Sequence, residues 1–163
     1  MSESRRIRIY FVLPMLVLLL GLATYVAIKL TTPTPPGSTL TVTVVAGEGW
    51  QHSDILLEPG RKVTIEYLDG LWFEDPPGRW HDAGGGPNPW TCTSPQCHEP
   101  MKTFPKYAVI GRVGTDGTLL PVGKRFEFMV NSSGSLYLRP NYGEGDMQIH
   151  RPLGSVRLKV TIS

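Results

Sequence analysis

The chain lacks every short motif by which a catalytic site is usually found in a sequence. It has no Gly-x-Ser-x-Gly, no phosphate-binding loop, no dinucleotide fingerprint and no His-Glu-x-x-His. Of its 4 histidines, His52 and His150 stand alone, and His81 is followed directly by Asp82. Neighbouring side chains on a loop seldom face each other, so we interpret His81-Asp82 as a solvated turn. The sequence therefore predicts a protein without catalytic activity.

The chain also lacks a cluster of basic residues. It contains 16 Lys+Arg and 14 Asp+Glu, but 4 of the basic residues and 1 acidic residue precede Thr31. The remainder carries 12 basic and 13 acidic residues, a net charge of −1. We therefore expect no surface that follows a phosphate backbone, and the composition argues against a nucleic-acid partner.

Charge is absent altogether from residues 9–28, a stretch of 20 residues. A helix rises about 1.5 Å per residue, so about 20 apolar residues cross a hydrocarbon core about 30 Å thick. Tyr10 and Tyr25 stand near its ends, where aromatic rings favour the headgroup region, and Pro14 is a candidate kink. The apolar core of a signal peptide is shorter, about 7–15 residues, and an A-x-A cleavage site is missing here. We predict an uncleaved transmembrane helix over 9–28 that anchors the chain in the lipid bilayer.

The flanks of this span predict its orientation. Three arginines lie within residues 1–8, whereas only Lys29 closely follows the span. By the positive-inside tendency, residues 1–8 stay in the cytoplasm and the C-terminal part lies outside it, in the periplasm of a bacterium. Residues 29–38 form a Pro-rich tether, since proline favours extended backbone. Residues 39–163 then form one domain held at the inner membrane by a single pass.

Alternation of apolar and polar residues, typical of half-buried strands, dominates residues 39–163. Asp69-Gly70 is a strong hairpin signal, so we expect one strand over 62–68 and its return strand over 71–73. The other alternating runs are 40–44, 107–113, 124–130, 135–139 and 155–162. No amphipathic helix is expected outside the membrane. About eight short strands separated by turns predict an all-β protein, an antiparallel β-sandwich.

Residues 75–105 break this rhythm, with seven prolines, four glycines and no period. A loop this long inside a compact domain is usually functional or disordered. It contains the only cysteines, Cys92 and Cys97, and a disulfide is the expected state of such a pair outside the cytoplasm. Two alternatives stay open. One is haem attachment with His98 and Met101, although the cysteine spacing is four residues rather than two; the other is zinc bound by both cysteines and His98.

The same loop carries large aromatic side chains. Trp80 and Trp90 either cover the sandwich or anchor a partner, because tryptophan dominates the residues that contribute most to binding. A disulfide in this stretch would stiffen the loop, and a preorganised surface binds at lower entropic cost. We therefore take Trp80, Trp90 and Phe104 as a candidate interface.

Several short segments of residues 40–163 follow one another in an order and spacing that match a known family. They are Val44-Val45-Ala46 followed by Trp50, then 57–65, Gly70-Leu71-Trp72, 108–114, Pro121-Val122-Gly123, 134–138 and Gly154-Ser155-Val156. In this order and spacing the chain resembles the bacterial calcium-dependent galactophilic lectins and the wider galactose-binding-like β-sandwich group. The resemblance implies a galactose-binding-like jelly roll. Those lectins also carry a Cys-x4-Cys pair at the corresponding place in the long loop.

In those lectins a calcium ion sits between two loops, and sugar hydroxyls complete its coordination. The positions of its Asp and Asn-Asn ligands correspond here to Tyr142 and Arg151-Pro152, whose side chains supply no carboxylate or amide oxygen. The sugar-contacting His-Pro-x-Gln segment corresponds to residues 85–89, where Asn88 is the remaining polar side chain. The nearby residues that offer oxygen atoms for a rebuilt metal or glycan site are Asn141, Glu144 and Asp146.

Two hypotheses of function follow. The first is a non-catalytic accessory subunit whose extracytoplasmic sandwich docks on and stabilises a larger integral membrane protein complex, for example a photosynthetic or respiratory one. The short tether favours it, because about eight extended residues reach about 25 Å at most. The second is a membrane-anchored, lectin-like carbohydrate-binding module, with or without calcium at the rebuilt site. Neither hypothesis requires a resident cofactor.

Overall fold

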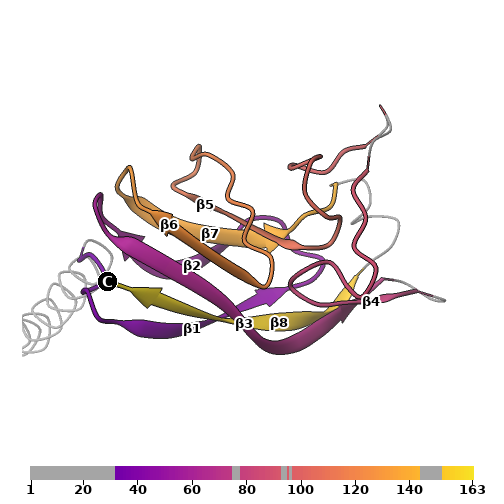
Figure 1. Ribbon diagram of the computed structural model, residues 1–163, viewed down its shortest axis with the longest axis horizontal. Coiled ribbons are helices and arrows are strands. Elements are labelled where there is room, and N and C mark those ends of the chain that lie inside the picture. The colour runs from indigo at the N-terminus through magenta and orange to yellow at the C-terminus, as the bar shows by residue number, and fades with distance from the viewer. Residues whose placement is uncertain (1–31, 75–77, 93–94, 96, 144–151) are drawn as a thin grey trace, which may run out of the picture. The chain divides into compact units, whose positions relative to one another are not determined.

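A computed structural model of the chain describes residues 32–74, 78–92, 95, 97–143 and 152–163 (Figure 1). The chain divides into two compact units, Met1–Thr32 and Pro33–Ser163, and only Thr32 of the first is described. The predicted span over 9–28, with Tyr10, Pro14 and Tyr25, therefore lies outside the described residues. Within the described ranges, no helix has the length and apolar character needed to cross a membrane.

The second unit is an all-β structure of two antiparallel sheets (Figure 1). The larger sheet has the order β1-β8-β3-β4, with β6 also paired to β3, and the smaller sheet has the order β2-β7-β5. The described strands are β1 Thr39–Val45, β2 Gln51–Leu57, β3 Lys62–Phe73, β4 Trp80–His81, β5 Val109–Val113, β6 Arg125–Met129, β7 Gly134–Pro140 and β8 Leu153–Ile162. The prediction of an all-β, antiparallel β-sandwich is confirmed for the described residues.

The core fills the space between the two sheets. Every second residue of β8 from Val156 to Ile162 is fully buried, and Leu136 and Leu138 of β7 meet this row from the opposite sheet. Successive side chains of a strand point to opposite faces, so this alternation places one apolar row inside and one polar row outside. Each fully buried aliphatic side chain contributes about 1.5–3 kcal/mol through the hydrophobic effect.

The predicted hairpin at Asp69-Gly70 is wrong. β3 runs without reversal from Lys62 to Phe73 and pairs with β8 on both sides of these residues. A β-bulge between Tyr67 and Asp69 interrupts the register, and the Tyr67 hydroxyl donates a hydrogen bond to the Gly70 carbonyl at 2.6 Å. Bulges and close backbone approaches favour glycine as much as turns do.

The end of the sandwich near β4 carries the long connection from β4 to β5, shown in rose to orange in Figure 1. β4 pairs with the last residues of β3, in the register Trp72↔His81 and Phe73↔Trp80. At its other end the connection joins the sheet where the Val109 N–H donates to the Ala83 carbonyl at 2.8 Å. The prediction had no strand at β4, because two residues are too few to show a period.

Candidate ligand-binding cleft

A cleft of about 580 Å³ opens beside β4 and the connection that follows it. Two tryptophans line it, Trp80 with 59% and Trp90 with 43% of its surface exposed. Asn88, the polar side chain singled out in the sequence, lines the same cleft. Three candidates from the sequence are thus brought together. The remaining described residues of its lining are Leu71, Arg79, His81, Asp82, Gly85, Gly86 and Pro87.

Trp80 is positioned by its place in β4. Its ring lies against Phe73 of the neighbouring strand, with ring centroids 4.7 Å apart. The next residue points to the opposite face, so His81 is buried and stacks on Tyr107 at 4.2 Å. The expected solvated turn at His81-Asp82 is therefore wrong for His81, whose pairing with Trp72 turns it inward.

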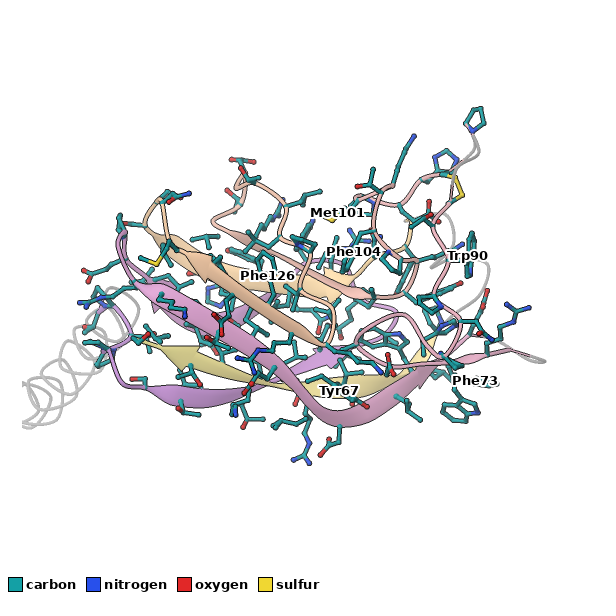
Figure 2. The ribbon with its side chains drawn as sticks, viewed as in Figure 1. Tyr67, Phe73, Trp90, Met101, Phe104 and Phe126 are labelled. Carbon is teal, nitrogen blue, oxygen red and sulfur yellow. A yellow bond between two sulfur atoms is a disulfide. The ribbon has the colours of Figure 1, made fainter. Side chains whose placement is uncertain are left out.

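Trp90 is held from the side by Lys106. The Lys106 N–H donates to the Trp90 carbonyl at 2.9 Å, and its ammonium lies 5.4 Å from the centroid of the indole ring. The same ammonium lies 3.5 Å from Glu99, whose side chain is 3% exposed. Figure 2 shows Trp90 and Phe73 at the end of the sandwich that carries β4. Because cation–π contact and a backbone hydrogen bond both fix it, the indole is a preorganised wall of the cleft.

Asp82 organises the glycine turn that lines the cleft. Its Oδ1 accepts hydrogen bonds from the N–H groups of Gly84 at 2.8 Å and Gly86 at 3.3 Å, and its Oδ2 lies 2.8 Å from the Lys124 ammonium. Burial raises the pKa of Asp82, but the hydrogen bonds from Lys124 and the two glycines outweigh it and hold this pKa below its ordinary value. The carboxylate is therefore ionised at neutral pH, with its oxygens already engaged.

The predicted disulfide is confirmed. Cys92 and Cys97 are bridged, with their Cα atoms 5.8 Å apart. Cys92 follows Trp90 by two residues. Haem attachment and zinc binding both need the two sulfurs that this bridge uses. The sulfurs lie within 4.8 Å of a Glu99 oxygen, yet as a disulfide they are not thiolate ligands.

Asn141 lies in the interior, with no exposed surface, rather than in the cleft. Its Oδ1 accepts from the Met101 N–H at 3.0 Å, and its Nδ2 donates to the carbonyls of Met101 at 2.8 Å and Phe104 at 3.0 Å. The amide thus fastens the segment 101–105, which Figure 2 marks with Met101 and Phe104. The Phe104 ring is half-buried and is not among the described residues that line the cleft.

Tyr142 occupies a position that the resemblance to the galactophilic lectins assigns to a calcium ligand, and its side chain offers neither a carboxylate nor an amide oxygen. Tyr142 is 1% exposed, and its hydroxyl accepts the Gly47 N–H at 2.6 Å. Calcium needs six to eight oxygen ligands, most of them carboxylate or carbonyl. The two acidic candidates, Glu144 and Asp146, lie outside the described residues.

Comparison with solved structures shows the same kind of fold. The chain is similar to a structure described as an EclA N-terminal domain, a PllA-like lectin, with a TM-score of 0.54 and 16% identity over 76% of this chain and 95% of that one. The IMPa metallopeptidase in complex with T-antigen has a TM-score of 0.38 and 14% identity, over 82% of this chain and 13% of that one. PliG of Aeromonas hydrophila, a periplasmic inhibitor of g-type lysozyme, has a TM-score of 0.33 and 10% identity, over 77% and 85%.

These comparisons establish the fold alone. The first confirms the expected lectin-like β-sandwich, whereas the two weaker likenesses carry no argument. No protein-family model matches the chain, and a search of curated proteins found no match.

Proposed function

We propose that the domain is a carbohydrate-binding module and that the cleft beside β4 is its binding site. The observation that carries this proposal is the convergence of Trp80, Trp90 and Asn88 on one cleft of about 580 Å³. Sites for small ligands span about 300–1,000 Å³ and combine aromatic walls with a few polar groups. A pyranose ring has a C–H face that packs on an indole, and a rim of hydroxyls that an amide can hydrogen-bond.

The lectin-like fold supports this proposal, which replaces the docking hypothesis as the main interpretation. In our proposal the sugar is bound without calcium, because Tyr142 buries its hydroxyl against Gly47 at the place where the related lectins have an acidic ligand. Recognition then rests on the two indoles and on the polar side chains of the cleft.

Replacing Trp90 by alanine should weaken glycan binding by more than tenfold, since one aromatic wall is lost and tenfold corresponds to about 1.4 kcal/mol. The measurement is a glycan array with the full chain in mild detergent, followed by calorimetry on the best ligand, in calcium and in EDTA. Met129→Ala is the control, because Met129 is 53% exposed and lies on β6, outside the described lining of the cleft.

EDTA should leave the affinity of the wild-type chain unchanged, as should Met129→Ala. A wild-type chain that binds no glycan in either buffer would refute carbohydrate binding. Glycan binding that disappears in EDTA would refute the calcium-free site.

A second candidate function, docking on a larger membrane complex, is favoured by an apolar patch on the outer face of the larger sheet. We define this patch as Leu71, Trp80 and Leu153, which are 45%, 59% and 70% exposed. Phe73 pairs with both Trp80 and Leu153, so the three residues lie on adjacent strands. An apolar patch that contains tryptophan is typical of a protein interface. In this proposal the span over 9–28 holds the domain on the periplasmic side of the inner membrane.

Gentle detergent extraction of native membranes, size separation and mass spectrometry test the docking proposal. The chain should comigrate in fixed ratio with a large complex, and Leu153→Ser should reduce the comigrating fraction several-fold because the most exposed residue of the patch becomes polar. Met129→Ser, on β6, should leave it unchanged. A chain that runs alone as a small particle would contradict docking.

A further inference from the structure

Two side chains with a formal charge line the described part of the cleft, and one of them is already paired. Among the described lining residues, Arg79 is the one cation and Asp82 the one anion, with His81 beside them. Asp82 is matched by Lys124 at 2.8 Å and by two backbone N–H groups, so its charge is already compensated. Within the described part of its lining, the cleft therefore presents one positive charge without a counterpart.

Arg79 is that charge. It directly precedes Trp80, and its carbonyl accepts the Glu74 N–H at 3.2 Å, which fixes its backbone beside the cleft. The Glu74 carboxylate lies 3.7 Å from His81 instead, and no ion pair of Arg79 is present in the described part of the chain. Arg79 is exposed, so its guanidinium is accessible to a ligand that enters the cleft.

We infer that the ligand of the cleft is an acidic glycan, a sugar that carries a carboxylate or a sulfate group. This inference rests on the proposed function and adds the class of ligand to it. The planar guanidinium of Arg79 presents a fork of N–H donors that matches a carboxylate or sulfate oxygen pair, and charge-assisted hydrogen bonds are about twice as strong as neutral ones. The indoles of Trp80 and Trp90 then hold the ring while Arg79 holds the acid.

Matched ligands that differ only in charge test the inference. Calorimetry with the full chain in mild detergent compares trigalacturonate with its methyl ester, and a sulfated galactan oligosaccharide with its desulfated form. At least one acidic member should bind about tenfold more tightly than its neutral partner, and which pair shows the difference tells carboxylate from sulfate recognition.

Two variants of Arg79 and one control variant test whether Arg79 causes the preference for acidic ligands. Arg79→Gln should abolish the difference between acidic and neutral ligands, while Arg79→Lys should retain part of it, since the charge stays and the fork is lost. Lys62→Gln is the control, because Lys62 begins β3 at the end opposite the cleft and pairs with Glu127 at 2.9 Å. It should leave the preference unchanged.

The outcomes separate this inference from the function on which it rests. Equal binding of acidic and neutral ligands by the wild-type chain overturns the acidic class while carbohydrate binding stands. A preference that survives Arg79→Gln also overturns the inference. If all four ligands and the glycan array fail to bind, the proposed function fails and the inference fails with it.

Discussion

Replacing Asn141 by alanine should lower the free energy of unfolding by about 3 kcal/mol, because a buried polar group without a partner costs about 1–3 kcal/mol. The variant leaves the Met101 N–H without its acceptor and removes a donor from the carbonyls of Met101 and Phe104. The Asn141 side chain has no exposed surface, so water cannot take the place of its amide unless the surrounding chain rearranges. Urea unfolding of the full chain in mild detergent, followed by tryptophan fluorescence, measures the loss.

Asn131→Ala is the matched control, because Asn131 is exposed in the turn before β7. Its effect should stay within about 0.5 kcal/mol, as for most surface substitutions. If the two variants unfold alike, the amide of Asn141 does not fasten the segment 101–105. The sequence hypothesis of a metal or glycan ligand at Asn141 would then regain its place.

The strands of the core could be predicted because their residues alternate. Residues 155–162 and 40–44 repeat with period two, and the structure has β8 at Leu153–Ile162 and β1 at Thr39–Val45. Half-buried strands can be recognised by this alternation, since one face of the strand is apolar and the other polar. The ends of each strand shifted by one or two residues because pairing with a neighbour, not the sequence pattern, decides where a strand stops.

The cleft could be predicted only in part. Trp80, Trp90 and Asn88 stood out as residue types, and the structure brings them together. Arg79 and Leu71 carried no signal, because they join the cleft through the pairing of β4 with the end of β3. That pairing lacks a local pattern, so no inspection of the sequence along one strand reveals it. Phe104 shows the opposite error, an aromatic in the long loop whose half-buried ring is not among the described lining residues.

The error at Asp69-Gly70 has a physical cause that the sequence hides. Asp-Gly suits a hairpin turn because glycine accepts positive φ, and Gly70 does have φ +93°. Inside β3 the same freedom serves a bulge, while Asp69 faces Arg157 of β8, whose guanidinium Nε donates to its Oδ1 at 2.7 Å. The hydrogen bond from Arg157 also lowers the pKa of Asp69. A cross-strand partner 88 residues away decides between the two uses of one dipeptide.

Gly70→Ala should lower the free energy of unfolding by about 4 kcal/mol, because backbone strain and overpacking each cost about 1–3 kcal/mol. A Cβ at this position would lie 2.4 Å from the Ser155 carbonyl oxygen and 2.9 Å from the Val156 Cα. Both atoms belong to the backbone of β8, so relief requires the β3–β8 pairing to open. Urea unfolding and amide hydrogen exchange of β8 measure the effect.

Gly60→Ala separates the strain from the clash. Gly60 also has positive φ, +83°, but a Cβ there would meet nothing within 4 Å. This variant should therefore cost about 1 kcal/mol, the strain of a left-handed backbone alone. Equal losses at the two positions would mean that β8 yields to the added methyl group, and the close packing of β3 on β8 would then be wrong. A larger loss at Gly70, with faster exchange in the paired amides of β3 and β8, is the result that this packing requires, because the added atom pushes these two strands apart.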